Sequence, residues 1–437
     1  MERMLMKDLI AWKDNPQKKP LVVQGVRQCG KTFLIEEFAR RYYEDFAYYR
    51  FDKESRVKEF FEEDINPVRI IKDLGLARGK AIKPHKTLIF FDEIQDCSNA
   101  ITSLKYFCED TPEYHIVTAG SLLGVALKKG TSFPVGKVEF LNLFPMSFYE
   151  FLYAHNEILA KELDNSTLQD DIWKKFKKEL ERIYKDFQII GGMPEVVKTW
   201  IDTSDIEAVE KKQDEILIGY KNDFGKYANP EDYPKISAVW QSIPSQLGKE
   251  NRKFIFSRVR KGLRAKDLED ALTWLVDSGL VYKVENIEKP GYPISSYANH
   301  TFFKLYMADI GLLRRHSDLP SSIIFDESPL FKEFKGAIAE NYIASELKIL
   351  YGKSKSKDLY YWTAEGSGKA EVDFVIQDDK KNIVPIEVKS GIVKHARSLT
   401  EYCKKFEPEE SVLTSLGEMT DRNIPLYVFW KFREFIK

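Results

Sequence analysis

The chain has 437 residues, of which 43% are hydrophobic and 13% aromatic, so it can bury substantial cores and is not a disordered tail. Its 67 lysines and arginines balance 68 acids, which excludes a globally basic nucleic-acid binder and leaves only a local patch for such a partner. Four cysteines without a C-x-x-C pair and six histidines without an H-E-x-x-H motif exclude a zinc or disulfide framework of the usual spacing. We expect neither a signal peptide nor a membrane span. We expect a cytoplasmic location.

Residues 20–32 carry the pattern G-x-x-x-x-G-K-[ST]. Residues 21–23 predict a strand buried on both faces, and the chain then turns through glycines into a helix that begins at Lys31. In this pattern backbone N–H groups cradle phosphates, the lysine reaches the β- and γ-phosphates, and the threonine hydroxyl binds Mg²⁺. The alternative is a glycine-rich turn with an exposed lysine. The predicted ATP site consists of Gly25, Val26, Arg27, Gln28, Cys29, Gly30, Lys31, Thr32 and Phe33, with Thr32 on the metal and Cys29 as a filler of the loop.

Residues 88–91 are all apolar and predict a second buried strand, which ends at Asp92 and Glu93. Ligands of open α/β sheets bind at this carboxyl edge. Asp92 is expected to hold Mg²⁺ through its water shell, and Glu93 to polarise the attacking water. A further strand over 114–118 leads to Ser121, a candidate sensor of the γ-phosphate. The alternative is a serine that caps the next helix.

Several of these features together resemble the prokaryotic AAA+-type P-loop ATPases that carry a C-terminal domain of unknown function with a restriction-endonuclease-like fold. They are the loop 25–32, the pair Asp92-Glu93, the Thr-Ala-Gly-Ser turn 118–121, the Phe-Pro-Met-Ser-Phe-Tyr-Glu-Phe run 144–151 and the Gly-Gly-Met-Pro-Glu signature 191–195. The resemblance implies an AAA+-like parallel sheet with helices on both faces. Family members carry an arginine where this chain has Lys137, which lacks the planar guanidinium fork. Arg258, Arg260 and Arg264 are the competing arginine-finger candidates.

The middle of the chain is predicted to be helical and to end in a basic module. Residues 249–266 contain eight lysines or arginines, interleaved with Phe254, Phe256 and Leu263. A helix over 265–277, Gly279 and a strand over 280–284 follow. This order is typical of a winged helix-turn-helix, whose helix enters a major groove, and the family resemblance points the same way. The alternative is an ATPase lid helix with solvated charges.

The last hundred residues predict a second site. A helix over 335–351 carries Glu340, and strict alternation in the hairpin 370–390 puts Val372, Phe374 and Ile376 on one face and Asp373, Glu387 and Lys389 on the other. The pattern resembles the PD-(D/E)XK nuclease core, in which acids bind Mg²⁺ and a lysine stabilises developing charge. Carried over to this sequence, the positions are Glu340, Asp373, Glu387 and Lys389. The alternative is a hairpin with exposed charges.

The predicted organisation is an α/β P-loop ATPase core over 1–150, a helical lid and winged-helix-like domain over 151–325, and a restriction-endonuclease-like domain over 326–437. The predicted function is that of a Mg²⁺-dependent ATPase that acts on or with DNA through 249–266 and the C-terminal domain, as a homo-oligomer if it follows its ring-forming relatives. The alternative is a regulatory switch, in which ATP binding reorders the domains and the C-terminal domain grips a protein without cleaving nucleic acid.

Overall fold

The computed structural model describes residues 1–120, 134–248, 253–325, 328, 332–353, 358–364, 370–378, 382–393 and 395–436. Ser121 and residues 249–252 of the basic segment lie outside the described residues. None of the described helices combines the length and the apolar character that a membrane crossing needs.

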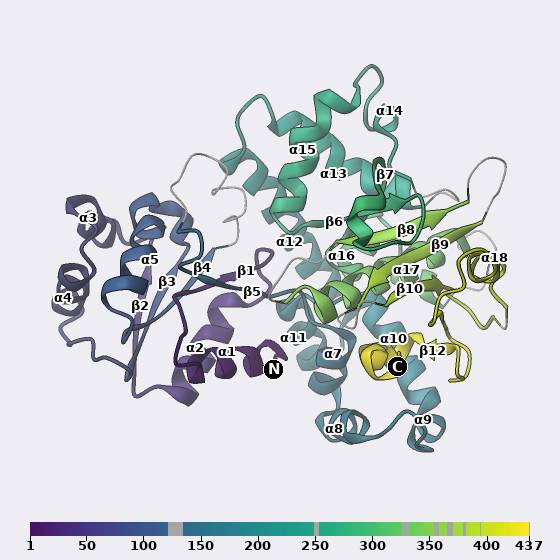
Figure 1. Cartoon of the computed structure of the whole chain (residues 1–437), viewed down its shortest axis with the longest axis horizontal. Coiled ribbons are helices and arrows are strands. Elements are labelled where there is room, and N and C mark those ends of the chain that lie inside the picture. Colours follow the sequence, from purple (N-terminus) through teal and green to yellow (C-terminus); the bar gives the residue numbers. More distant parts are fainter. Residues whose placement is uncertain are drawn as a thin grey trace.

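The first sheet is parallel throughout and has the order β2-β3-β4-β1-β5. Its strands are β1 (Leu21–Gln24), β2 (Asp45–Arg50), β3 (Thr87–Asp92), β4 (His115–Gly120) and β5 (Glu139–Asn142). Alternate residues of these strands enter two separate hydrophobic cores, as period-two side chains require. One core contains α1 (Leu5–Asp14) and α2 (Lys31–Tyr42), and the other α3 (Ser55–Glu63), α4 (Pro67–Ala77) and α5 (Ser98–Asp110). The predicted α/β core with helices on both faces is confirmed (Figure 1).

A helical region follows this sheet, and its helix starts carry recognisable caps. Ser147 and Glu150 form a capping box at α7, Asn156 and Asp205 cap α8 and α12, and Pro194 opens α11. The helices are α7 (Phe148–His155), α8 (Glu157–Asn165), α9 (Ile172–Lys175), α10 (Lys177–Ile190), α11 (Pro194–Thr203), α12 (Ile206–Tyr227), α13 (Tyr233–Leu247), α14 (Phe256–Val259) and α15 (Ala265–Asp277).

The second sheet is mixed and has the order β12-β11-β10-β9-β8-β6-β7. Its strands are β6 (Val281–Ile287), β7 (Ala298–Met307), β8 (Leu359–Thr363), β9 (Glu371–Gln377), β10 (Ile383–Val388), β11 (Val412–Ser415) and β12 (Asn423–Pro425), accompanied by α16 (Ile310–His316), α17 (Lys332–Tyr351), α18 (Arg397–Phe406) and α19 (Phe432–Phe435). Strand β6 pairs in parallel with β8. The expected domain boundary between residues 325 and 326 therefore divides a continuous sheet. Strand β8, which follows this boundary, pairs with the edge of the β6–β7 hairpin that would otherwise be unpaired.

The predicted alternation in β9 is broken by a bulge. Tyr360 pairs with Val375 and Trp362 with Val372, so β9 holds one extra residue between these pairs. Val372 consequently joins the core on the α18 side, whereas Phe374 and Ile376 enter the core that contains α17. The prediction that these three side chains share one face is wrong for this reason.

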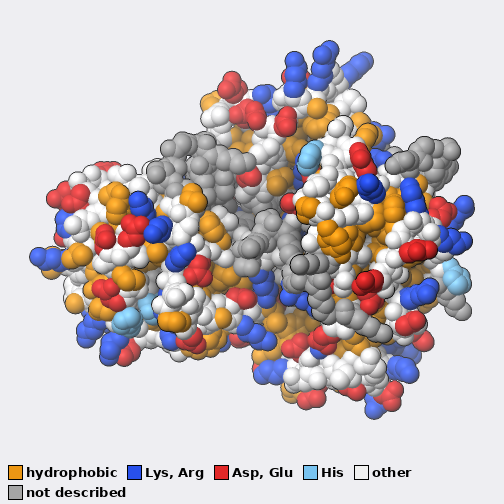
Figure 2. Space-filling view, viewed as in Figure 1, with side chains coloured by type: hydrophobic (Ala, Val, Ile, Leu, Met, Phe, Trp, Pro, Cys, Tyr) orange, Lys and Arg blue, Asp and Glu red, His pale blue; other side chains and the backbone are white. Residues whose placement is uncertain are grey.

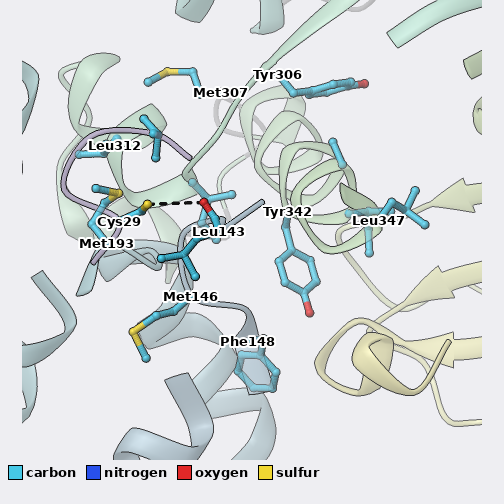
Figure 3. Close-up of a cluster of buried hydrophobic side chains, with 14 of the residues drawn as sticks. Cys29, Leu143, Met146, Phe148, Met193, Tyr306, Met307, Leu312, Tyr342 and Leu347 are labelled. Atoms are coloured by element: carbon cyan, nitrogen blue, oxygen red, sulfur yellow. Dashed lines mark hydrogen bonds between the residues drawn. The ribbon is translucent and has the colours of Figure 1, made fainter. Parts of the chain in front are cut away.

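The largest hydrophobic cluster extends from Leu5 in α1 to Ile436 near the end of the chain. Figure 3 shows its centre, where side chains of the phosphate loop, residues 143–148, Met193, β7, α16 and α17 gather. The ATPase core and the second sheet are thus packed against a shared interior.

Candidate functional site

The phosphate loop joins β1 to α2 and is shaped by two glycines. Gly25 has a φ of 151°, and a Cβ there would lie 2.1 Å from the backbone oxygen of Leu143. Gly30 has a φ of 92°, in the left-handed region that side chains rarely adopt. Both positions therefore require glycine, and the resulting turn places the start of α2 at the end of β1.

Lys31 lies inside this turn and is 7% exposed. Its Nζ donates to the backbone oxygens of Gly25 at 2.8 Å and Val26 at 3.0 Å. The Cys29 thiol is fully buried and lies 3.5 Å from the oxygen of Leu143, which fits a packing role. The loop thus holds an ammonium group among its own carbonyls, in the place where a P-loop lysine meets phosphate.

A hydroxyl and a carboxylate meet at the neighbouring strand tip. The Thr32 hydroxyl donates to Asp92 Oδ2 at 2.9 Å, and the Tyr48 hydroxyl donates to the same oxygen at 3.0 Å. Burial raises the pKa of Asp92 above its usual value, while the bonds from Thr32 and Tyr48 act in the opposite direction. Two oxygen ligands of this kind, side by side, fit the preference of Mg²⁺.

Glu93 directly follows this carboxylate, as the sequence predicts. Its φ is 51°, a left-handed conformation that is uncommon outside glycine and that clusters at functional sites. The Gln95 amide donates to Glu93 Oε2 at 2.6 Å and orients the side chain. The structure brings Thr32, Asp92 and Glu93 to one edge of the sheet. The hydrogen bond from Tyr48 to Asp92 is not predicted from the sequence.

The long helix α12 lies against the outside of the loop. The Arg27 guanidinium pairs with Asp223, and the Tyr220 hydroxyl donates to the backbone oxygen of Arg27 at 3.1 Å. A Cβ on Gly219 would lie 3.7 Å from the Gln28 amide. The helical region therefore contacts the predicted nucleotide site directly.

Arg3, which lies just before α1, supports the loop and is 6% exposed. Its guanidinium donates to the backbone oxygens of Cys29 at 2.8 Å and Phe144 at 2.6 Å, and to Glu150 at 3.1 Å. Glu150 also closes the capping box of α7. The Phe-Pro-Met-Ser-Phe-Tyr-Glu-Phe run therefore has a structural role, because it supplies the Phe144 oxygen and the Glu150 carboxylate. The sequence around Arg3 contains no pattern that predicts these contacts.

The Gly-Gly-Met-Pro-Glu signature lies against the same loop. A Cβ on Gly30 would lie 3.5 Å from Pro194, and the Met146 N–H donates to the oxygen of Gly192 at 2.7 Å. The N–H of Gly192 donates to the carboxylate of Asp309 at 2.5 Å. The signature therefore joins the loop, the end of the first sheet and the start of α16.

Two cavities flank the loop. The first, of about 450 Å³, is mostly apolar and is lined by Met1, Arg3, Gly30, Phe33, Met146, Ala154, Pro194, Glu195, Lys198, Ile201 and Asp202. The second, of about 440 Å³, lies between the loop and the second sheet, with Gly25 and Val26 on one wall and Ser278, Tyr282 and Lys348 on the other. A Cβ on Gly279 would lie 3.6 Å from the nitrogen of Val26, so the α15–β6 turn reaches the loop.

The arginine-finger candidates lie away from the loop of their own chain. Arg258, Arg260 and Arg264 precede α15 or cap its start, whereas the other end of α15 is the one that contacts Val26. Thirteen helical residues separate the two ends by about 20 Å. Lys137 pairs with Glu109 at 2.8 Å. None of the four thus contacts the phosphate loop within this chain.

The second predicted site is buried, so the alternative of a hairpin with exposed carboxylates is wrong. Glu340, Asp373 and Glu387 are 3%, 6% and 2% exposed. Asp373 accepts the Val388 N–H at 2.8 Å, and Lys389 donates to Glu387 at 2.6 Å. Burial, and then the charge of Asp373, raise the pKa of Glu387 well above its usual value.

Two residues of β7, which sequence reasoning missed, complete this second cluster. Lys304 is fully buried and lies 3.7 Å from Glu340 and 2.5 Å from Glu371, while the Tyr306 hydroxyl donates to Glu340 at 2.9 Å. Lys304 also lowers the pKa of Glu387. An internal ammonium thus neutralises acids that sequence reasoning assigned to a metal. Within the described part of the chain, no group of three or more metal-ligating side chains is found.

Comparison with known proteins divides the chain into three matched segments. An AAA domain matches residues 17–152, a domain of unknown function (DUF8612) matches 181–322, and another (DUF4143) matches 335–428. An uncharacterised protein of Methanocaldococcus jannaschii is 22% identical over 387 residues, which cover 88% of this chain and 78% of that protein. The AAA match coincides with the parallel sheet and the phosphate loop, so the first third is a P-loop ATPase domain of a kind that binds ATP. The restriction-endonuclease-like identity of the last segment stays a prediction.

Two solved structures are similar over longer stretches. The Walker-type ATPase of Pyrococcus abyssi aligns with a TM-score of 0.45 and 14% identity, over 71% of this chain and 94% of that chain. A signal transduction ATPase with numerous domains and a tetratricopeptide repeat sensor, from Pyrococcus horikoshii, aligns with a TM-score of 0.27 and 13% identity, over 80% of this chain and 50% of that one.

Proposed function

We propose that this protein is a Mg²⁺-dependent ATPase that works with DNA, its hydrolytic site formed by the phosphate loop and the tip of β3. The observation that carries the proposal is the 2.9 Å contact between the Thr32 hydroxyl and Asp92, beside the buried ammonium of Lys31. In this arrangement phosphates replace the two loop carbonyls as partners of Lys31. Thr32 and Asp92 would hold Mg²⁺, which when bound would supply positive charge to the transferring phosphoryl group.

Glu93 acts as the base that orients and polarises the attacking water. Its backbone is fixed by the Asp92 carboxylate, which accepts the Glu93 N–H at 3.1 Å, and its side chain is aimed by Gln95. A carboxylate positioned in this way contributes about 10²- to 10⁴-fold to the rate. Ser121, which follows β4, is proposed as the sensor of the γ-phosphate.

The adenine base is proposed to enter the apolar cavity beside Gly30 and Phe33. The loop N–H groups hold the α- and β-phosphates, so the nucleoside extends from the start of α2. The cavity of about 450 Å³ begins at this point, and Pro194 and Lys198 of α11 also line it. This placement gives the Gly-Gly-Met-Pro-Glu signature a role in nucleotide binding.

Calorimetry with ATP, and turnover measured by phosphate release, test the proposal. Lys31→Ala is expected to weaken ATP binding by about 10- to 150-fold, because a charged hydrogen-bond donor is lost. Glu93→Gln is expected to bind ATP normally and to hydrolyse it about 10²- to 10⁴-fold more slowly. The exposed residue Lys161 on α8 offers a matched control as Lys161→Ala. Normal turnover in both active-site variants would refute the assignment.

The DNA part of the proposal is supported by the basic segment before α15. Residues 253–266 contain six lysines or arginines and no acid. Stimulation of ATP turnover by DNA is the expected result. Indifference to DNA, together with ATP-dependent capture of a protein partner, favours the alternative of a regulatory switch.

Cleavage by the C-terminal cluster is a second candidate activity, favoured by one observation. Glu387 Oε2 has no hydrogen-bond partner among the described residues, and Asp373 lies beside it. This pair of carboxylates is the part of the cluster that fits a divalent ion. Plasmid nicking in Mg²⁺ by the wild type and by Asp373→Ala, at equal concentrations, decides whether the cluster cleaves.

A further inference from the structure

Strand β7 leaves the sheet at an outward bulge. Glu285 pairs with Phe303 and Asn286 with Asn299, so the three residues 300–302 have no partners in the ladder. Bulges of this kind redirect side chains and are frequent beside functional sites. Here Phe302 is 49% exposed and the side chain of His300 is 73% exposed. The large aromatic ring of Phe302 is therefore partly exposed to solvent at the bulge.

The exposed ring of Phe302 lies next to a cation, and the neighbouring residue Phe303 is anchored to the basic segment. The Phe254 N–H donates to the oxygen of Phe303 at 2.8 Å, so the start of the basic segment runs along the bulge. Phe254 and Phe303 stack with ring centroids 5.3 Å apart and anchor this contact. Lys253 Nζ lies 5.5 Å from the centre of the Phe302 ring. The aromatic platform and the basic segment thus form one surface.

This surface is strongly positive in a chain whose net charge is −1. Arg258, Arg260, Lys261, Arg264 and Lys266 are all exposed. Figure 2 shows lysine and arginine side chains together at the upper tip of the molecule, where α14 and the start of α15 lie in Figure 1. Glu285, the acid nearest to His300 at 3.0 Å, is already paired with Lys283 at 2.6 Å.

The next turn of α15 argues against a major-groove contact. Glu269 and Asp270 are exposed one turn after Lys266 and carry the same sign of charge as phosphate. A helix that enters a duplex groove would bring these carboxylates close to the DNA backbone. The lysines and arginines before α15 and the ring of Phe302 remain available to a flexible single strand of nucleic acid.

We propose that the β7 bulge and residues 253–266 bind single-stranded nucleic acid, with one unpaired base stacked on Phe302 and the phosphates on the adjacent lysines and arginines. Base stacking on an aromatic side chain tolerates any sequence, because every base has a π-face. The inference rests on the DNA part of the proposed function and narrows it to unpaired strands.

Fluorescence anisotropy with a labelled thymidine 20-mer, its duplex and a 20-mer of abasic sites tests this surface in the full-length protein without nucleotide. The wild type is expected to prefer the thymidine strand to both other probes. Phe302→Ala is expected to weaken strand binding about 5- to 150-fold, and Phe302→Trp to retain it. Arg260→Ala is expected to weaken all three probes and to reduce the salt slope by about one.

Phe325→Ala is the matched control, because Phe325 is 54% exposed and has Lys185 5.6 Å from its ring centre, on another part of the surface. Equal affinity for strand and duplex, equal affinity for thymidine and abasic strands, or equal effects of Phe302→Ala and Phe325→Ala would each overturn the proposal. ATP binding is measured by calorimetry on the same preparations. A loss of ATP binding would concern the proposed ATPase site alone, since neither Phe302 nor Phe325 contributes to that site.

Discussion

Arg3 shows how a single side chain connects the N-terminal segment before α1 to the phosphate loop. Its planar group binds the oxygens of Cys29 and Phe144 and the carboxylate of Glu150, all in a nearly buried position. The ammonium of a lysine is a compact point charge and cannot match this fork of partners. The residue therefore matters for its geometry as well as for its charge.

Arg3→Lys is expected to lower the stability and to weaken ATP binding. An unsatisfied buried oxygen costs about 1–3 kcal/mol, and the altered position of Cys29 disturbs the loop. Chemical denaturation and calorimetry with ATP measure the two effects. Arg41→Lys, at an exposed pair with Glu2, is the control and is expected to change neither. Unchanged ATP affinity in Arg3→Lys would separate Arg3 from the function of the loop.

Glu346 is a buried acid of α17 that contacts the ATPase core. It is 1% exposed, and its Oε1 accepts the Phe148 N–H at 2.8 Å. Oε2 has no hydrogen-bond partner among the described residues. Burial raises the pKa of Glu346 to about 8, and the nearby charge of Glu150 acts in the same direction.

The raised pKa makes the stability depend on pH. Because the folded protein binds this proton more tightly than the unfolded chain, Glu346 contributes less stability as the pH rises from about 4.5 to about 8. Glu346→Gln keeps the acceptor for Phe148 and removes the titration. We expect the variant to gain on the order of 1 kcal/mol or more over the wild type between pH 6 and pH 8.5, seen as a widening difference in Tm. Glu409→Gln, at an exposed site, is expected to follow the wild type, and parallel curves for Glu346→Gln would contradict the argument.

At the scale of residues, the sequence predicts what local spacing determines. Lys31 and Thr32 are specified by the loop pattern, and Asp92 by its place at the end of an apolar strand. Arg3, Tyr48 and Lys304 are not predicted, because their partners lie far along the chain and only the packed fold brings them together. Such contacts leave no periodic signal.

At the scale of elements, the turn before α11 joins three parts of the molecule. A Cβ on Gly192 would lie 2.1 Å from the oxygen of Met146, and one on Gly191 would lie 2.3 Å from Asp309. The sequence predicts a turn from the two glycines and Pro194, but not its position against the phosphate loop. Glycine at position 192 is explained by the close approach of the Met146 backbone, and glycine at position 191 by the Asp309 carboxylate and by a φ of 77°.

Gly192→Ala is expected to destabilise the protein, because the added methyl group overlaps backbone that cannot move without disturbing Met146. Overpacking of this kind costs about 1–3 kcal/mol. Urea unfolding measures the change in the free energy of unfolding. Gly391→Ala is the control, since a Cβ there meets nothing within 4 Å. Equal stabilities of the two variants would show that the turn relaxes easily.

The β9 bulge marks the limit of prediction for the second sheet. Hydrophobic alternation predicts the strands and the placement of Asp373 and Glu387 on one face, because these features depend on period two. One extra residue in β9 moves Val372 to the opposite core. The insertion is specified by the partner strand β8, so the sequence of β9 alone does not reveal it.

At the scale of the whole molecule, no clean division separates the ATPase region from the second sheet. Strand β6 pairs with β8 across the expected boundary, and the Asn142 amide donates to the oxygen of Gly352 at 2.7 Å. Glu346 adds its contact with the start of α7. The P-loop end of the molecule is therefore supported by residues that follow position 325.

A fragment of residues 1–325 is accordingly expected to fold poorly, whereas the full chain unfolds in one transition. The cut exposes the edge of β6 and the apolar surface that α17 covers, and an unpaired strand edge of this kind promotes aggregation. Differential scanning calorimetry and light scattering measure both properties. Co-expression of 1–325 with 326–437 is the control, because the missing strands can then pair and restore ATP binding. A fragment 1–325 that is monomeric, and that binds ATP like the full chain, would show that the shared sheet is dispensable to the ATPase. The nucleotide state would then have no structural route to the second sheet through β6.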